Sequence, residues 1–315
     1  MVRDLIGLKG DEPIRELKIG VFAGGSSSER DISFKSGKAV FEALQSIKLN
    51  VCFVDVDELR FEDQIKQSGV DLVFIALHGR FGEDGEAQKI LEKVNIPYTG
   101  SGSEASALAM DKVLAKELFL KNNLNSPKFK CFSSMNSVSS DEVTFPCVVK
   151  PRHEGSSVGL SVVRAEGDYL KALEMAFLCD GEVIVEEYIS GRELTVGIID
   201  GIALPVVEIV TDTGVYDYNA KYESQNTKYI VPAVLEETEK KRVQEIAVKA
   251  DQVLGCKGFS RVDIRLSEKN EINILEINTI PGMTERSLLP MAAKQKGITF
   301  VELCVIMLRL AMMKK

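Results

Sequence analysis

The sequence predicts an α/β fold that opens with a parallel α/β domain, because apolar strands alternate with helical segments in its first third. Residues 18–23 form an apolar run typical of a buried strand, and a helix is expected from about Asp31, with Asp31 or Ser33 as its N-cap. Residues 71–77 form a second such strand, and residues 86–94 have helical periodicity. In sheets of this kind, functional loops gather at the carboxyl ends of the strands.

Beyond about residue 110, helices and strands follow a different pattern, which predicts an α+β second part. Helices are expected at 112–121, 168–177, 236–254 and 300–313, and strands at 145–150, 183–189, 194–199 and 202–210. The last two strands suggest an antiparallel layer. We therefore expect an N-terminal domain (1–110), a central subdomain (111–205) and a C-terminal subdomain (206–315).

Length and composition are those of an ordinary globular protein. The 315 residues suggest two or three domains, and 45% apolar with 27% charged residues is a typical balance. No apolar run approaches the roughly 20 residues that span a bilayer, and the first residues lack the apolar core of a signal peptide. We therefore expect a cytoplasmic protein with no membrane partner. Six scattered cysteines have no metal-binding spacing, and we expect them to be reduced and buried.

The formal net charge is −8, and the basic residues are dispersed along the chain. This balance argues against nucleic acid or an anionic membrane surface as the main partner. It does not argue against a small anionic substrate, because a few local basic groups can hold phosphates inside an acidic protein.

Two neighbouring strands near the C-terminus carry oxygen-bearing side chains where a buried strand should carry hydrocarbon. Side chains two apart on a strand share a face, so Glu276 and Asn278 point the same way, as do Arg261 and Asp263. Three oxygen ligands, from Asp263, Glu276 and Asn278, suit Mg²⁺, and a cation removes the cost of burying them unpaired. Arg261 would clamp an anion beside them, which suggests phosphate chemistry. The alternative is a set of structural ion pairs with Arg261 and Arg265.

A Gly- and Ser-rich segment at 154–159 could close over phosphates, although the chain has no P-loop motif. It offers backbone N–H groups and the hydroxyls of Ser156 and Ser157, with Lys150 just before it and Lys112 at the start of the second part. The same pattern is typical of an ordinary turn, and a lysine at a strand end is most often solvated.

Further polar side chains fall in loops or at strand ends that a ligand could reach. They are Glu29, His78, Glu186, Glu187, Glu193, Lys221 and Tyr222. A carboxylate in an open loop could bind an ammonium group, and one at a strand end could accept hydrogen bonds from a ribose or an adenine. The long polar loop at 211–232 is typical of an active-site lid. The plainer interpretations are that the acids are solvated, that His78 is structural and that the loop is an exposed hairpin.

Taken together and in order, these segments resemble the D-alanine–D-alanine ligases of the ATP-grasp superfamily, from Lys18 to the C-terminal helix. The resemblance is carried by residues 24–30, 78–85, 110–112, 149–159, 216–222, 261–263 and 275–288. It implies a parallel α/β substrate-binding domain followed by a two-part ATP-grasp domain. Departures are mild, since Tyr188 stands where a tryptophan is common and Ile280 where some members have serine.

For the first D-alanine, the resemblance implies that Glu29 holds the ammonium in an arrangement linked to Ser156 and Tyr222, with His78 nearby. Tyr222 is similar to the residue of the dipeptide-forming enzymes rather than to that of relatives that accept D-lactate. For the second D-alanine, Ser287 and Leu288 would bind the carboxylate.

The resemblance also implies how ATP, the metal ions and the reacting carbonyl are held. Arg261 and the Gly282 backbone N–H would form the oxyanion site. Phosphate ligands would be Lys112, Lys150, Lys221 and the loop with Ser157; adenine and ribose ligands would be Glu186, Glu187, Tyr188, Ile189 and Glu193; ligands of two Mg²⁺ (or Mn²⁺) ions would be Asp263, Glu276 and Asn278.

The expected activity is ATP-dependent ligation of two D-alanine molecules through an acyl phosphate, for peptidoglycan precursor synthesis, by a homodimer. One alternative is another ATP-grasp ligase, such as the D-alanine–D-lactate type. A non-catalytic nucleotide-binding protein on the same fold is a second alternative. That protein would be expected to lack some of the four polar residues of the strand pair, and this chain has all of them.

Overall fold

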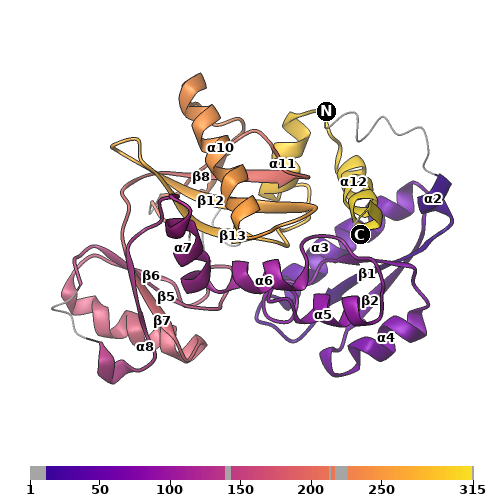
Figure 1. Ribbon diagram of the computed structural model, residues 1–315, viewed down its shortest axis with the longest axis horizontal. Coiled ribbons are helices and arrows are strands. Elements are labelled where there is room, and N and C mark those ends of the chain that lie inside the picture. The colour runs from indigo at the N-terminus through magenta and orange to yellow at the C-terminus, as the bar shows by residue number, and fades with distance from the viewer. Residues whose placement is uncertain (1–11, 139–142, 213, 217–225, 314–315) are drawn as a thin grey trace.

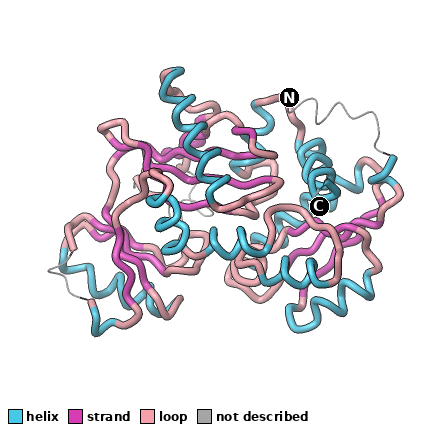
Figure 2. The backbone as a smooth tube through the Cα atoms, viewed as in Figure 1, coloured by secondary structure: helices cyan, strands magenta, loops and turns pink. Residues whose placement is uncertain are grey.

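The computed structural model describes residues 12–138, 143–212, 214–216 and 226–313. Within these ranges the strands form three sheets. Figures 1 and 2 show an N-terminal unit at one side, a small sheet at the other side and a large sheet between and above them.

The N-terminal unit has a parallel sheet, as predicted, and its strand order is β2-β1-β3. Its strands are β1 (Lys18–Gly24), β2 (Asn50–Val56) and β3 (Leu72–Ile75), and its helices are α2 (Glu12–Arg15), α3 (Arg30–Ser46), η1 (Glu58–Arg60), α4 (Phe61–Ser68) and α5 (Glu86–Lys93). Helix α6 (Ser103–Met110) leads out of the unit. The apolar runs that predicted β1 and β3 are almost wholly buried, which explains their unbroken hydrocarbon character.

The predicted N-cap of the first long helix is wrong. Helix α3 begins one residue after Glu29, which holds the N-cap position without a side-chain cap hydrogen bond. The Ser33 hydroxyl is instead buried, where it accepts from the Gly24 N–H at 2.8 Å and donates to the Ala76 carbonyl at 2.7 Å. Ser33 therefore ties the helix to the ends of two strands, a role that local sequence does not reveal.

The small sheet is antiparallel, in the order β4-β7-β5-β6. Its strands are β4 (Phe129–Phe132), β5 (Cys147–Pro151), β6 (Ser161–Val163) and β7 (Val183–Glu187), with η2 (Met135–Ser137), η4 (Glu166–Asp168) and α8 (Tyr169–Cys179) beside them. Helix α7 (Lys112–Lys121) precedes this sheet in sequence but packs against the large sheet and its helix α10.

The large sheet is also antiparallel, with the order β11-β10-β8-β12-β13 and β9 paired to β8. Its elements are β8 (Gly191–Ile199), β9 (Ile202–Ala203), β10 (Val207–Val210), β11 (Lys228–Ile230), β12 (Phe259–Ser267) and β13 (Ile272–Asn278), followed by α11 (Leu288–Gln295), with α10 (Glu237–Val253) between β11 and β12. The boundary predicted near residue 205 falls inside this sheet, because β8 pairs with β9 and also with the later strands β10 and β12. A division that keeps each sheet intact would fall between β7 and β8.

The last helix, α12 (Phe300–Met313), returns to the N-terminal unit and packs on α3 and β3 (Figure 1). One apolar core therefore contains residues from both ends of the described chain, among them Leu44, Phe74 and Leu308. Buried apolar area of this kind is the main stabilising term of a fold.

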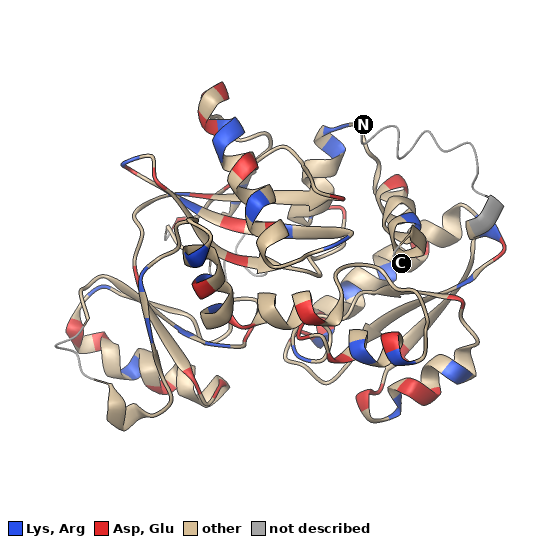
Figure 3. Cartoon of the chain, in the orientation of Figure 1, with Lys and Arg blue, Asp and Glu red and all other residues tan. Residues whose placement is uncertain are grey.

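Surface features agree with sequence expectations only in part. Cys147, Cys256 and Cys304 are buried, but Cys131 is exposed on β4, so the expectation that the cysteines are buried is wrong there. Acidic and basic segments are intermixed along α4, α5 and α10 (Figure 3). Among the helices of the described ranges, none has the length and apolar character needed to cross a membrane.

Replacing Leu308 by alanine should lower the free energy of unfolding by about 2–5 kcal/mol, because the change leaves a cavity in the core that joins α12 to α3. The matched control is Leu178→Ala on α8, where the leucine is 87% exposed and the effect should stay within about 0.5 kcal/mol. Urea unfolding followed by circular dichroism measures both, and equal shifts of the two variants would contradict the packing of α12.

Candidate active site

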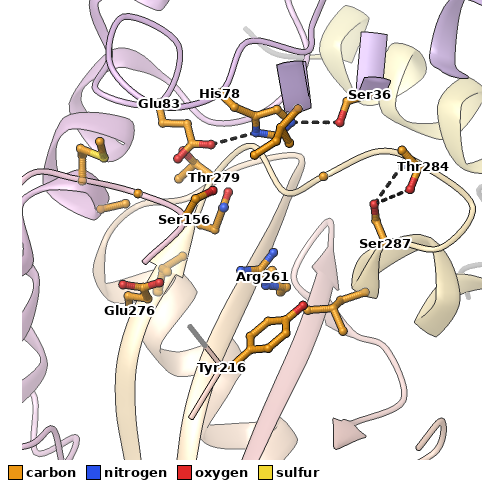
Figure 4. A pocket seen from close by; sticks show the side chains of 18 of the residues that line it. Ser36, His78, Glu83, Ser156, Tyr216, Arg261, Glu276, Thr279, Thr284 and Ser287 are labelled. Carbon is orange, nitrogen blue, oxygen red and sulfur yellow. Dashed lines mark hydrogen bonds and ion pairs between the residues drawn. The ribbon is translucent and has the colours of Figure 1, made fainter. Parts of the chain in front are cut away.

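Residues from all three units line a cavity of about 410 Å³. His78 comes from the N-terminal unit, Ser156 from the loop between β5 and β6, and Arg261 from the large sheet (Figure 4). A second cavity of about 80 Å³ extends toward the small sheet, and Glu276 and Tyr216 line both. Two ligands could therefore meet at Glu276.

Strands β12 and β13 bring the predicted polar residues together. Arg261 lies opposite Asn278, and Asp263 lies opposite Glu276. Because each residue is two positions from its neighbour on the same strand, all four side chains belong to one face of the sheet. A register shift between Asp263 and Ile264 interrupts the ladder just beyond them, as β-bulges often do beside functional sites.

Arg261 and Asp263 form a buried bidentate ion pair. Arg261 donates from Nε to Asp263 Oδ1 at 2.9 Å and from Nη2 to Oδ2 at 2.7 Å, and Thr195 Oγ1 also donates to Oδ1 at 2.6 Å. Burial alone would lower the pKa of Arg261, but the Asp263 carboxylate outweighs burial and raises it. The alternative of structural ion pairs is thus realised for Arg261, whereas Arg265 pairs with Glu193 at 3.0 Å.

The same residues fit a hard divalent cation. Asp263 and Glu276 supply carboxylate oxygens and Asn278 an amide oxygen, on facing strands beside both cavities. Among the described residues, no group of three His, Cys, Asp or Glu side chains forms a complete metal cage. A partial shell of this kind matches Mg²⁺, which completes its coordination with water and substrate phosphates.

The predicted phosphate loop has an unusual backbone. Ser156 and Ser157 are consecutive non-glycine residues with positive φ, 47° and 59°, in a region that side chains rarely adopt. Ser157 Oγ donates to the Tyr216 carbonyl at 3.1 Å, so this loop contacts the segment that follows β10. Conformations of this kind cluster at ligand-binding sites, which favours a binding loop over an ordinary turn.

Lys112 is buried under that loop, and burial lowers its pKa. Its ammonium donates to the carbonyl oxygens of Arg152, at 3.3 Å, and Glu154. Asp111, the N-cap of α7, binds the Arg152 guanidinium through both carboxylate oxygens. From the N-terminal unit, Arg80 donates to Glu154 Oε1 at 2.8 Å. Sequence reasoning missed Arg80 and Arg152, whose hydrogen-bond partners lie up to 99 positions away.

Lys150 and Glu186 lie together on neighbouring strands of the small sheet. Lys150 Nζ is 3.0 Å from Glu186 Oε1, and Lys116 of α7 approaches the same oxygen at 3.0 Å. Glu186 is therefore not the solvated acid of the plainer interpretation. Lys116 was missed, although its spacing of four from Lys112 puts both on one helical face.

The smaller cavity is lined by residues expected around adenine and ribose and by two expected at the phosphates, Lys150 and Ser157. Its wall includes Lys150, Ser157, Glu186, Glu187, Tyr188, Ile189 and Glu193. Glu187 is exposed and accepts from the Lys128 N–H at 3.0 Å. Lys221 and Tyr222 lie outside the described residues.

Glu29 is buried at the edge of the larger cavity rather than among its lining residues. A methyl group at Gly155 would lie 3.2 Å from Glu29 Oε1, and one at Gly79 would lie 3.1 Å from Oε2. Glycine at these two positions therefore lets the loops after β3 and β5 approach the carboxylate closely. Glu29 therefore lies next to the loop that carries Ser156.

His78 connects the N-terminal unit to the loop after β13. Its Nδ1 lies 3.0 Å from Glu83 Oε1 and its Nε2 lies 3.0 Å from Ser36 Oγ (Figure 4). Ser36 Oγ in turn accepts from the Met283 N–H at 3.1 Å. A neutral imidazole that donates from Nδ1 and accepts at Nε2 satisfies all three contacts. Ser36 and Glu83 were missed as site residues.

The loop after β13 presents anion-binding groups to the cavity. Gly282, Thr284 and Leu288 line it, together with Ser287, the N-cap of α11. The Ser287 hydroxyl lies 2.9 Å from Thr284 Oγ1 and accepts from the Thr284 N–H at 3.1 Å. A helix N-terminus with free N–H groups favours a carboxylate, so the position of this pair agrees with the predicted role.

Comparisons with known proteins agree with the geometry. A family model described as the D-ala D-ala ligase C-terminus matches residues 118–309, and one described as the D-ala D-ala ligase N-terminus matches residues 58–101. The D-alanine–D-alanine ligase of Syntrophotalea carbinolica is 43% identical over 293 residues, which cover 93% of this chain and 95% of that protein.

Solved structures give the same result. The D-alanine–D-alanine ligase of Bacillus anthracis superposes with a TM-score of 0.84 at 34% identity, covering 94% of this chain and 97% of its own. The same enzyme complexed with ATP superposes with a TM-score of 0.82 at 30% identity and the same coverage. These structures are similar to the present chain over all three units.

Asp263→Asn should lower the free energy of unfolding by roughly 3 kcal/mol, because it leaves the Arg261 guanidinium buried without its bidentate partner. Asp55→Asn removes an Arg–Asp contact of similar length, between Arg30 and Asp55, where both side chains are about half exposed. That control should cost about 0–1 kcal/mol. Urea unfolding measures both variants, and equal losses would show that burial of the pair is not what matters.

Proposed function

The chain belongs to the D-alanine–D-alanine ligase family, and we propose that it joins two D-alanine molecules while converting ATP to ADP and phosphate. The observation that carries the proposal is the pair of adjoining cavities that share Glu276. The smaller has lysines and acids suited to a nucleotide, and the larger has an arginine and a helix N-terminus suited to carboxylates. Phosphoryl transfer between the two ligands would occur where the cavities meet.

In the first step, the carboxylate of one D-alanine attacks the γ-phosphate of ATP, giving an acyl phosphate and ADP. Glu29 would hold the ammonium of this D-alanine next to the Ser156 loop. Lys112 and Lys150, both buried at the phosphate side, would offset charge on the transferring group. Catalysis of this kind consists mainly of positioning and electrostatic stabilisation.

In the second step, the amine of the other D-alanine attacks the acyl carbonyl and an amide bond forms. Phosphate leaves with the oxygen that joined it to the carbonyl carbon and takes up the proton that the amine loses. Arg261 uses Nε and Nη2 for Asp263, so Nη1 remains to stabilise the tetrahedral oxyanion together with the Gly282 N–H. Ser287 and the N-terminus of α11 would hold the carboxylate of the attacking molecule.

Asp263, Glu276 and Asn278 would hold two Mg²⁺ or Mn²⁺ ions, which would neutralise charge on the transferring phosphoryl group when bound. Lys221 and Tyr222 would complete the site from the loop after β10. Exclusion of water matters because water would hydrolyse the acyl phosphate. The hydrogen bond from Ser157 to the Tyr216 carbonyl joins the loop between β5 and β6 to the described residues that follow β10, at the wall of the smaller cavity.

We further propose that the enzyme is a homodimer, acts in the cytoplasm and supplies the dipeptide for peptidoglycan precursors. Ligation of D-alanine to D-lactate remains the alternative for the second substrate. These finer points are supported by family membership.

The purified chain with ATP and Mg²⁺ should release phosphate when D-alanine is added but not when L-alanine is added, and mass spectrometry should detect D-alanyl-D-alanine. Competition between D-alanine and D-lactate or D-serine as second substrate, scored by product mass, identifies the preferred acceptor. Phosphate release that does not depend on D-alanine would overturn the proposed function.

His78→Ala should lower kcat/KM for D-alanine by about tenfold to a hundredfold, because the imidazole links Glu83 to Ser36 and so to the loop that carries Gly282. His153→Ala removes the only other histidine, whose side chain is 37% exposed, and should change kcat/KM by less than about threefold. Initial rates of phosphate release measure both, and a similar loss in the two variants would refute a special role for His78.

A further inference from the structure

Lys116 is a buried lysine to which the proposed reaction gives no task. Its side chain on α7 is fully buried, and its ammonium donates to Ser126 Oγ at 2.9 Å. Ser126 donates in turn to the Ile274 carbonyl of β13 at 2.8 Å. Burial lowers the pKa of Lys116 to about 8, with Glu186 opposing the shift. A buried charge needs a partner, and Lys116 has a carboxylate 3.0 Å away.

That carboxylate serves two lysines at once. Glu186 Oε1 lies 3.0 Å from Lys116 and 3.0 Å from Lys150. Burial alone would raise the pKa of Glu186, but the two ammonium groups outweigh burial and lower it. The buried cluster therefore has one more positive than negative charge, and Glu186 can lose either lysine and still keep a counter-ion.

The two lysines differ in what else they can reach. Lys150 lines the smaller cavity and lies on β5, on the same face as Glu186, because Val148 is the residue that pairs with Glu186. Lys116 is not among the residues that line either cavity. It reaches Glu186 from α7, which packs on the large sheet. Lys150 can therefore contact a ligand in the smaller cavity. Lys116 instead connects the large sheet, through Ser126, to the small sheet, through Glu186.

We propose that Lys116 is a positioning residue that keeps Glu186 neutralised, so that Lys150 can leave Glu186 for the phosphates of ATP. Without Lys116, movement of Lys150 to the phosphates would leave the Glu186 carboxylate buried without a counter-ion. Lys150 would therefore stay paired with Glu186. The inference rests on the proposed function, because it concerns ATP at that site.

The test is the dissociation constant for ATP with Mg²⁺, measured by isothermal titration calorimetry on the full chain. Lys116→Met keeps the length and apolar stem but removes the charge, and should weaken ATP binding by about tenfold. Lys121→Met is the matched control, since Lys121 is exposed at the end of the same helix, and should change binding by less than about twofold.

A double-mutant cycle separates positioning from a merely structural role. In a Glu186→Gln background no carboxylate restrains Lys150, so Lys116→Met should weaken ATP binding by less than about twofold there. A structural role predicts the same loss in both backgrounds, and that result would overturn the proposal. Unchanged ATP binding by Lys116→Met in the otherwise native chain would also overturn it.

Lys116→Arg and Lys116→Gln provide a second comparison if the methionine variant does not fold. Both can donate to Ser126, but only arginine keeps the charge, so ATP should bind the arginine variant about tenfold more tightly. Equal affinities would overturn the proposal. Failure of the native chain to bind ATP at all would instead count against the proposed function, so the two failures are distinguishable.

Discussion

The antiparallel pairing of β12 with β13 is the constraint on which the site depends. Its register fixes Arg261, Asp263, Glu276 and Asn278 on one face of the large sheet. Burial of that face forces the charges to satisfy one another, which Arg261 and Asp263 do through a bidentate pair. Everything else approaches this fixed face: the loop between β5 and β6, the loop after β13 and the N-terminal unit all close around it. A one-residue slip of β13 against β12 would turn Glu276 and Asn278 to the other face, away from Arg261 and Asp263.

Around that face, the buried cations contact carboxylates or backbone carbonyl oxygens. Lys112 is held by carbonyl oxygens, and Glu186 is shared by two lysines. Arg80 and Arg152 sit outside, where they tie the phosphate loop to its neighbours. In the cluster of Lys116, Lys150 and Glu186, two cations share one carboxylate. The phosphates of a bound nucleotide would offset the remaining positive charge there.

The parallel sheet and the polar strand pair could be predicted from sequence, because they depend on local periodicity: unbroken apolar runs in β1 and β3, and alternation in β12 and β13. Ser36, Arg80 and Lys116 could not, because their partners come from distant segments through tertiary contact. Ser33 was expected to cap the helix because the local sequence does not reveal its actual hydrogen-bond partners, Gly24 and Ala76. The boundary predicted near residue 205 lies within the large sheet, where a hairpin brings no change of composition that the sequence could reveal.

Helix α12 determines when the N-terminal unit can complete its core during synthesis. It completes the apolar core of the N-terminal unit by packing on α3 and β3, although the ribosome makes it some 250 residues after α3. During synthesis, the apolar core of the N-terminal unit therefore stays incomplete on the side that α12 covers. It is completed only after the large sheet and the loop carrying Ser287 have been made. Only a chain that has been translated through α12 has a finished first unit. A shortened translation product lacks that closure and would present exposed apolar surface to chaperones and proteases.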